Sequence, residues 1–169
     1  MSEEENDVQE REPINRNVGA IKPPRRYVYL AGPVELEGTW RKRAGEALTK
    51  MGLEPLDPLR GEEHKTVGKH IQASVPASLL VFRDLNDMNR IKYSGGLVLM
   101  NLSTTAEGRK PIGTLFELMW CWDNRIPVIA VMGRDCDPSY RNHPWIKTMV
   151  SYEATSVTDA LNLIEEYFA

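Results

Sequence analysis

The chain has 169 residues, of which 41% are hydrophobic and 27% charged, a composition typical of one globular domain with a substantial core. The net charge of −3 disfavours a dedicated nucleic-acid binder, because such proteins usually carry a basic surplus. No apolar run approaches the ~18 residues that cross a membrane, and the acidic N-terminus is unlike a signal peptide. Cys121 and Cys136 have neither zinc-ligand nor redox-motif spacing, so we interpret them as free thiols and expect a cytoplasmic protein.

Residues 1–24 differ in composition from the rest of the chain. They are polar and charged, lack apolar periodicity and end in two prolines. Because such a segment buries too little apolar surface to offset the entropy of ordering, it predicts a flexible tail. We therefore expect one folded domain over residues 25–169.

The first half of this domain begins with a strand pattern. Residues 27–31 form a short apolar run that ends at Gly-Pro, which predicts a buried strand and a turn. Residues 40–51 carry apolar side chains at helical spacing and are followed by a glycine, a favourable helix C-cap. The stretch LEPLDP predicts a second short strand, and the polar residues 60–69, which include two glycines, predict a mobile loop.

The second half repeats the alternation of helices and strands. The expected elements are a helix over about 76–90, a strand over 96–102, a helix over 113–122, a strand over 126–133, a weak strand over 149–152 and a helix over 158–168. The run GLVLMNL is apolar almost throughout, as in a parallel strand covered on both faces. Residues 134–145 match neither pattern and predict a break.

Strands that alternate with helices predict an α/β fold with an open parallel sheet of about five strands and helices on both faces. In such sheets ligands bind at the carboxyl ends of the strands, where the strand order reverses. The loops that follow the strands are therefore where a functional site is expected.

One carboxylate stands out beside such a loop. In RKPIGTLFELMW (109–120), Glu117 is surrounded in the sequence by apolar side chains. Burial of an ionised carboxylate without a partner is costly. Either Glu117 lies on the solvated side of a helix, or it lies in a cleft, near the helix N-terminus, where the helix dipole favours its ionised form.

Four short motifs follow one another along the chain and are expected at the same edge of the predicted sheet. They are YLAGP (29–33), DLNDM (84–88), GTLFE (113–117) and IPVIAV (126–131). Together they resemble the nucleoside 2-deoxyribosyltransferase-like family, which includes related 2′-deoxynucleoside 5′-monophosphate N-glycosidases. The resemblance implies a single flavodoxin-like, or Rossmann-like, domain. It also implies cleavage of the N-glycosidic bond of 2′-deoxyribonucleosides or their 5′-monophosphates through a covalent deoxyribosyl-glutamate, with no metal or organic cofactor.

The resemblance assigns three catalytic positions. Glu117 matches the nucleophile, Asp84 matches the carboxylate that assists proton transfer to the departing base, and Tyr29 matches a tyrosine that orients the nucleophile. Asp87 lies one helical turn after Asp84 and is the alternate, substrate-binding carboxylate. Each assignment has a structural alternative. Glu117 is otherwise a solvated helix glutamate, the aspartates are surface residues paired with a cation such as Arg90, and Tyr29 is a core aromatic residue.

Further candidates for contact with the substrate follow from the same motifs. They are Gly32, Pro33, Asp57, Gly113, Thr114 and Asn142. Gly32 allows the turn and a close approach of the backbone to a ligand. Asp57 contacts the base or caps its loop, and both readings are open. Asn142 matches a family asparagine that reaches sugar hydroxyls, frequently across a subunit boundary.

One position departs from the family pattern. Pro111 stands six residues before Glu117, where transferases often carry an aspartate and the monophosphate hydrolases commonly a serine. Other groups offer a candidate phosphate site: the hydroxyls of Ser103 and Thr104 and the positive charge of Arg109. Arg60 and Lys110 are further candidates for the positive charge.

Three functions stay open from the sequence. The first is a deoxyribosyltransferase-like enzyme, the second a deoxynucleoside monophosphate N-glycoside hydrolase, and the third a non-catalytic nucleotide-binding sensor domain. The expected partner is a small-molecule nucleoside or nucleotide, with no nucleic acid and no membrane. The resemblance further implies a homo-oligomer with shared active sites.

Overall fold

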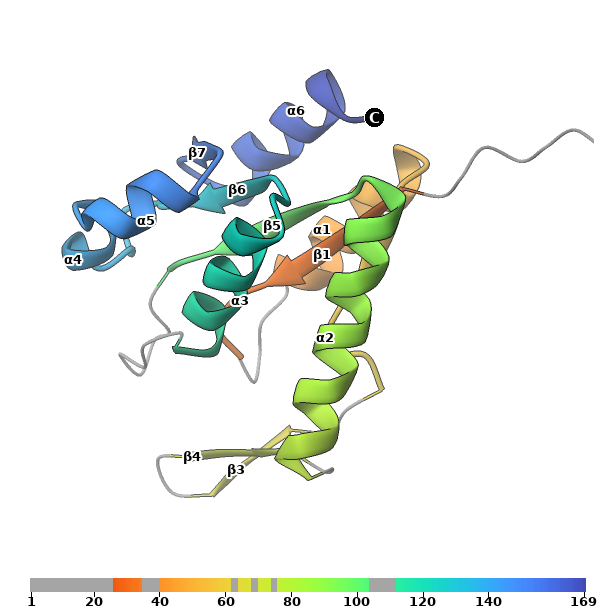
Figure 1. Ribbon diagram of the computed structural model, residues 1–169, viewed down its shortest axis with the longest axis vertical. Coiled ribbons are helices and arrows are strands. Elements are labelled where there is room, and N and C mark those ends of the chain that lie inside the picture. The colour runs from red at the N-terminus through yellow and green to blue at the C-terminus, as the bar shows by residue number, and fades with distance from the viewer. Residues whose placement is uncertain (1–25, 35–39, 62–63, 68–69, 74–75, 104–111) are drawn as a thin grey trace, which may run out of the picture.

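A computed structural model describes residues 26–34, 40–61, 64–67, 70–73, 76–103 and 112–169 (Figure 1). Its centre is a five-stranded sheet with the order β2-β1-β5-β6-β7, in which every neighbouring pair is parallel. The strands are β1 (Tyr27–Ala31), β2 (Glu54–Leu56), β5 (Leu97–Asn101), β6 (Val128–Val131) and β7 (Tyr152–Ala154). The predicted α/β fold with a five-stranded parallel sheet is confirmed.

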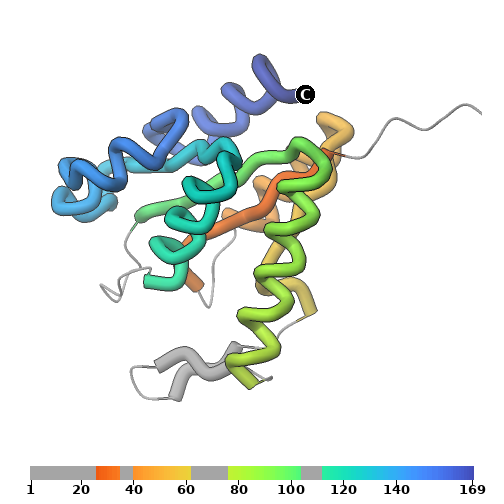
Figure 2. The backbone as a smooth tube through the Cα atoms, in the orientation of Figure 1, coloured from red at the N-terminus to blue at the C-terminus, as the bar shows by residue number. Residues whose placement is uncertain are grey.

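Helices cover both faces of this sheet (Figures 1 and 2). The helices α1 (Trp40–Lys50) and α6 (Val157–Tyr167) pack on the face that buries Val28 and Leu30. The helices α2 (Ala77–Ser94), α3 (Ile112–Asp123) and α5 (Pro144–Met149) pack on the face that buries Tyr29. Because side chains alternate along a strand, β1 contributes to both cores and is buried on both sides.

The expectation of a loop over 60–69 is wrong. Residues 64–73 contain an antiparallel hairpin of β3 (His64–Val67) and β4 (His70–Ala73), which lies beside the start of α2 and apart from the main sheet (Figure 1). Each strand has four residues, and β-branched residues are interspersed with histidines and polar side chains. A pattern this short and polar gives little hydrophobic signal for a strand.

The expected break over 134–145 contains two short helices, α4 (Pro138–Arg141) and the start of α5. Both begin with a proline, and the Asp137 side chain accepts a hydrogen bond from the Ser139 backbone N–H at 2.9 Å, which caps α4. Helices of four and six residues are too short for apolar periodicity to reveal. The final strand lies at Tyr152–Ala154, a few residues after its expected position.

The strand order places the expected ligand-binding edge of the sheet at the ends of β1 and β5. Their successive neighbours lie on opposite sides, β2 beyond β1 and β6 beyond β5, which makes this pair the point where the order reverses. Gly32 follows β1 here with φ of 155°, and a Cβ on it would lie 3.0 Å from the Trp40 ring and 3.1 Å from Asn101. Glycine is thus required where β1 turns away from β5.

A second glycine is expected to control stability. Gly96 leads from α2 into β5, and a Cβ on it would overlap the Tyr27 carbonyl oxygen and lie 2.7 Å from Ile91 Cγ2. Because a strand backbone and a buried side chain must both shift, we expect Gly96→Ala to lower the free energy of unfolding by ~2–4 kcal/mol. Urea denaturation followed by circular dichroism measures this change.

The matched control is Gly113→Ala. Outside its own helix backbone, no atom of the described residues lies within 4 Å of the Cβ that this change adds, and Gly113 is in the first turn of α3. Alanine there is expected to leave stability unchanged or raise it by up to ~1 kcal/mol. Equal effects of the two substitutions would contradict the packing that we describe around Gly96.

Candidate active site

The hydroxyl of Tyr29 donates a hydrogen bond to Glu117 Oε1 at 2.7 Å, which links the centre of β1 to the second turn of α3. Tyr29 is fully buried, because its strand lies between two neighbours and beneath the helices on this face. Glu117 is half-buried and turned toward the sheet, not toward solvent. The two residues, 88 positions apart in the chain, therefore form one fixed pair.

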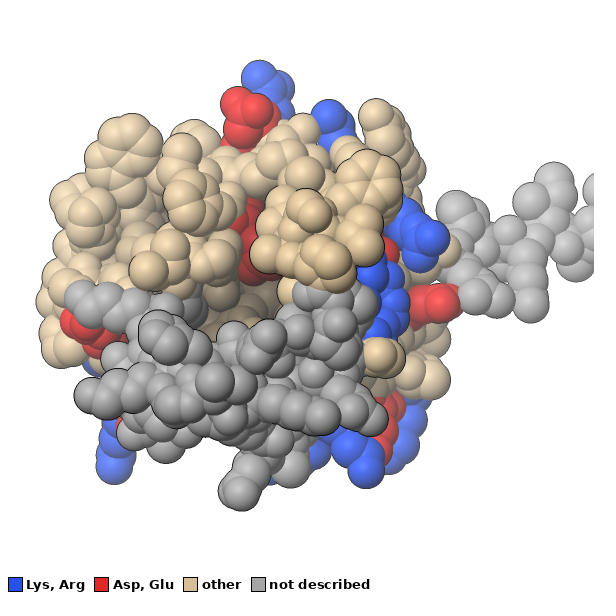
Figure 3. All heavy atoms as spheres, turned by 90° about the horizontal axis from the view of Figure 1, so that it is seen from below, with Lys and Arg blue, Asp and Glu red and all other residues tan. Residues whose placement is uncertain are grey.

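Glu117 and Asp84 line the same pocket between α2 and α3, with a volume of about 450 Å³. Its other lining residues are Gly113 and the apolar side chains of Val81, Leu85, Met88, Phe116 and Trp120. The view in Figure 3 shows acidic atoms in a furrow between two uncharged mounds. The pocket thus presents two carboxyl groups among apolar walls, at a volume within the range of small-molecule sites.

Burial sets the protonation of this pair. Desolvation raises the pKa of Glu117 to about 7, against the hydrogen bond from Tyr29, which lowers it, and with the charge of Asp84, which raises it. Desolvation likewise raises the pKa of Asp84 to about 6. Burial and the neighbouring carboxylates raise the pKa of Tyr29 further above its usual range, so Tyr29 stays protonated and able to donate. Both carboxyl groups therefore titrate near neutral pH.

The order of these pKa values matters for their roles. Because desolvation raises the pKa of Glu117 to about 7 and that of Asp84 to about 6, a single proton on the pair favours Glu117. The form with Glu117 ionised and Asp84 protonated is then the minor one. The Tyr29 hydrogen bond acts on Glu117 alone and raises the population of that form.

One oxygen of Asp84 is buried without a partner. Within the part of the chain that the structure describes, Asp84 Oδ1 accepts no hydrogen bond. A buried polar atom left unpaired costs ~1–3 kcal/mol, and such costs concentrate at functional sites. This oxygen is therefore available to a ligand in the pocket.

Asp87, the alternate carboxylate, is placed differently. It is 1% exposed and forms ion pairs with Arg60 at 2.5 Å and with Arg90 at 3.7 Å. Arg60 also donates to the Asp57 carbonyl at 2.8 Å, so this ion pair fastens the turn after β2 to α2. Asp87 does not line the pocket of Glu117, and the charge of Arg60 is engaged by Asp87.

The remaining candidates near β1 and β2 are structural in their contacts. Asp57 Oδ1 accepts from the Leu59 N–H at 2.9 Å, which caps the loop after β2, and lies 3.6 Å from Arg41 Nε. The carbonyls of Gly32 and Pro33 accept hydrogen bonds from the Arg41 guanidinium at 2.6 and 2.9 Å. Sequence reasoning missed Arg41, which is 6% exposed, whereas Lys42 and Arg43 after it are exposed.

The structure separates the other predicted residues. Gly113 lines the pocket, Thr114 is buried beside it in α3, and Ser103 follows β5 with its N–H donating to Asn101 Oδ1 at 3.0 Å. Asn142 is exposed at the junction of α4 and α5 and does not line this pocket. Thr104, Arg109, Lys110 and Pro111, with the predicted tail 1–24, lie outside the described residues.

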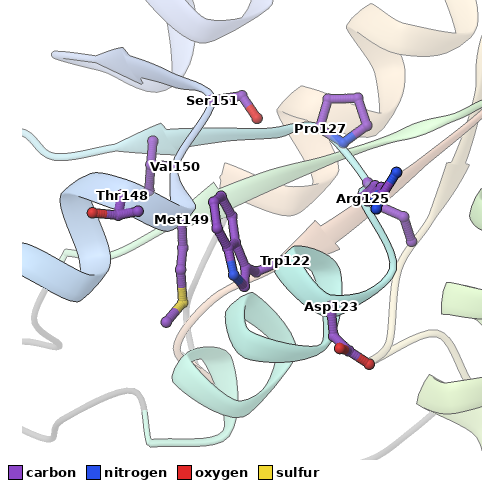
Figure 4. A pocket seen from close by; sticks show the side chains of 9 residues that line it. Trp122, Asp123, Arg125, Pro127, Thr148, Met149, Val150 and Ser151 are labelled. Atoms are coloured by element: carbon purple, nitrogen blue, oxygen red, sulfur yellow. The ribbon is translucent and has the colours of Figure 1, made fainter.

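A second hollow of about 590 Å³ lies at the opposite, amino end of β6 (Figure 4). Trp122, Pro127 and Met149 form its walls. Its charged residues, Asp123 and Arg125, point away from each other, so no polar groups converge there (Figure 4). No group of three or more potential metal-ligating side chains occurs among the described residues.

Comparisons with known proteins support the fold. No protein-family model matches the chain, and no curated protein sequence matches it significantly. Its structure is similar to that of a 2-deoxyribosyltransferase from the psychrotolerant bacterium Bacillus psychrosaccharolyticus, with a TM-score of 0.52 and 16% sequence identity. The match covers 80% of this chain and 90% of the other. At this identity the likeness shows a shared α/β fold. None of the described helices is long and apolar enough to span a bilayer.

Proposed function

We propose that this protein cleaves the N-glycosidic bond of 2′-deoxyribonucleosides or their 5′-monophosphates, with Glu117 as nucleophile. The observation that carries the proposal is the Tyr29–Glu117 hydrogen bond at 2.7 Å, in a pocket that also holds Asp84. The motifs YLAGP, DLNDM and GTLFE supply one residue each to this arrangement. The shared fold with a 2-deoxyribosyltransferase is consistent with it.

In the first step the ionised Glu117 attacks the anomeric carbon of the sugar. A bond forms between its carboxylate oxygen and C1′, while the bond between C1′ and the base nitrogen breaks with its electron pair on the base. The protonated Asp84 donates its proton to the departing base. Two carboxyl groups with these roles are the arrangement of retaining glycoside chemistry, whose transition state resembles an oxocarbenium ion.

In the second step an acceptor releases the sugar from Glu117. A nitrogen of a second base, or a water oxygen, bonds to C1′ as the ester bond to Glu117 breaks, and Asp84 takes up the acceptor's proton. Transfer and hydrolysis thus differ in the acceptor alone. Tyr29 donates to Glu117 in both steps and stabilises its ionised form as leaving group.

The pocket walls suit the flat, weakly polar faces of a nucleobase. Val81 and Leu85 on α2 lie across from Phe116 and Trp120 on α3, and aromatic side chains offer stacking surfaces. Asp84, also on α2, then lies among the groups that contact the base. The unpaired Asp84 Oδ1 favours a catalytic site over a sensor domain, which needs no buried proton donor.

The test is chromatography of reaction products for the parent and Glu117→Ala. Thymidine or deoxycytidine is incubated with free adenine, and the 5′-monophosphates are incubated in parallel without an acceptor. New deoxyadenosine that is absent with the variant is the expected result. Free base from monophosphates alone would identify the hydrolase, and no product at high enzyme concentration would favour the sensor domain.

We further propose that the chain forms a homo-oligomer through the helices beside the pocket. Large apolar side chains on this side of the molecule are exposed: Leu79, Val81 and Phe82 on α2, Ile112, Phe116, Met119 and Trp122 on α3, and Trp145 on α5. Exposed apolar patches of this kind mark interaction sites. A copy docked here would adjoin the pocket, as a shared active site requires.

The oligomer is tested by a charge on α2. Phe82 is 64% exposed and does not line the pocket, so Phe82→Lys is expected to lower the association constant at least ~10-fold with the fold retained. Light scattering coupled to size-exclusion chromatography measures the mass over a concentration series. Glu165→Gln, on the exposed side of α6, makes the same change in charge and is expected to have no effect. A monomeric parent at all concentrations would contradict the proposal.

A further inference from the structure

The carboxyl end of β1 is held by a buried side chain in place of a neighbouring strand. β2 ends at Leu56, opposite Tyr29, whereas β1 continues to Ala31. Among the described residues, the carbonyls on this side of β1 beyond Tyr29 therefore have no strand backbone to pair with. Arg41 of α1 supplies the donors: Nε to the Leu30 carbonyl at 3.3 Å, Nη2 to Gly32 at 2.6 Å and Nη1 to Pro33 at 2.9 Å.

An arginine suits this position for a geometric reason. Its guanidinium carries donors in a rigid planar fork, which matches three carbonyls along one turn of backbone better than the single ammonium of a lysine. The same fork lies 3.6 Å from Asp57, the residue that follows β2. Arg41 thus joins α1 to the ends of two strands at the edge where the candidate site lies.

Arg41 also brings a positive charge into the protein interior, since it is 6% exposed and its hydrogen-bond acceptors on β1 and in the turn after it are neutral carbonyls. Its charge lowers the pKa of Glu117 and that of Asp84, against the desolvation that raises both. The other groups that act on the pair are Tyr29 on β1, Arg60 after β2, and Arg83 and Asp87 on α2. Arg41 is notable because it acts on both carboxyl groups.

We propose that Arg41 is a positioning residue of the active site, which fixes the loop after β1 through its fork and acts through its charge on Glu117 and Asp84. The inference rests on the proposed function for its meaning in catalysis. Its structural content, the fork and the charge, is independent of turnover. Arg41 itself does not line the pocket and is not assigned a contact with the substrate.

The charge is tested by NMR titration of the carboxyl carbons of Glu117 and Asp84 in the parent and in Arg41→Gln. Both pKa values are expected to rise in the variant, and the pH optimum of any turnover is expected to move upward with them. Arg43→Gln removes the same charge from an exposed position on α1 and is expected to change neither. Unchanged pKa values in folded Arg41→Gln would overturn the proposal.

The fork is tested by Arg41→Lys, which keeps the charge. Here the carboxyl pKa values are expected to stay near those of the parent, while the backbone amides of residues 30–32 and 34 exchange at least ~10-fold faster with solvent. Parent-like exchange would overturn the positioning role, and this variant also decides the matter if Arg41→Gln does not fold. Because neither measurement needs turnover, an inactive parent would overturn the proposed function and not this inference.

Discussion

Replacing Glu117 by glutamine is expected to lower kcat by on the order of 10⁴-fold or more, the scale on which enzymes lose activity without their covalent nucleophile. The amide is close in shape to the carboxylate and still accepts the Tyr29 hydrogen bond, so the pocket keeps its form. An amide oxygen, however, does not form and release a glycosyl ester. Single-turnover kinetics with the preferred nucleoside or monophosphate measure the loss.

The same variant is expected to be more stable than the parent at alkaline pH. The folded-state pKa of Glu117 is raised to about 7 from an ordinary value of 4.5, so its contribution to stability is full below pH 4.5 and is lost as the pH rises through 7. At pH 8 the parent holds a poorly solvated carboxylate that glutamine replaces with a neutral group. The melting temperature of Glu117→Gln should therefore exceed that of the parent at pH 8 and differ less at pH 4.

The matched control for both effects is Glu46→Gln on the exposed side of α1, which should change neither activity nor the melting temperature. A Glu117→Gln variant that is folded and retains a tenth of the parent activity would contradict the nucleophile assignment. Such a result would leave Glu117 as a buried structural partner of Tyr29.

Replacing Asp84 by asparagine is expected to lower kcat/KM by ~10²–10⁴-fold, the contribution of a positioned general acid. The loss should be smaller for substrates whose bases leave readily, because these need less protonation at the transition state. Steady-state kinetics on a series of nucleobases measure this dependence. Asp87→Asn is the informative comparison: it breaks the Arg60 ion pair and is expected to lower stability more than kcat at a permissive temperature.

The pH dependence distinguishes the two carboxyl groups further. For the parent, kcat/KM should be greatest between about pH 6 and 7, because below this range both groups are protonated and above it both are ionised. In Asp84→Asn the alkaline decline should vanish, and the acid limb should follow the ionisation of Glu117 alone. An unchanged alkaline limb in this variant would contradict the role of Asp84 as proton donor.

Most of the sheet could be predicted because its strands are buried on both faces. The runs at 27–31 and 96–102 are apolar almost throughout, and each emerged within a residue of its expected bounds. The hairpin β3–β4 and the helix α4 could not be predicted in the same way. Each of these two strands and this helix has only four residues, and they depend on turn and cap chemistry instead of a repeating apolar pattern.

The sequence predicts some residues of the candidate site better than others. The resemblance pointed to Tyr29 and Glu117, which the fold brings to 2.7 Å, but it left Asp84 and Asp87 as alternatives. Geometry separates these two, because a turn of helix directs Asp84 into the pocket and Asp87 toward Arg60. Arg41 gave no signal, since its partners are backbone carbonyls whose availability depends on where β2 ends.

The covalent role of Glu117 is tested most directly by mass spectrometry of the intact protein after reaction with a 2′-deoxy-2′-fluoro nucleoside. The fluorine on the sugar carbon C2′ slows release of the sugar from the enzyme. We expect a mass increase of one fluorodeoxyribosyl group, located by peptide mapping on Glu117 and absent from Glu117→Gln. An unmodified protein that nevertheless turns over natural substrates, or a label on another residue, would contradict the covalent role of Glu117.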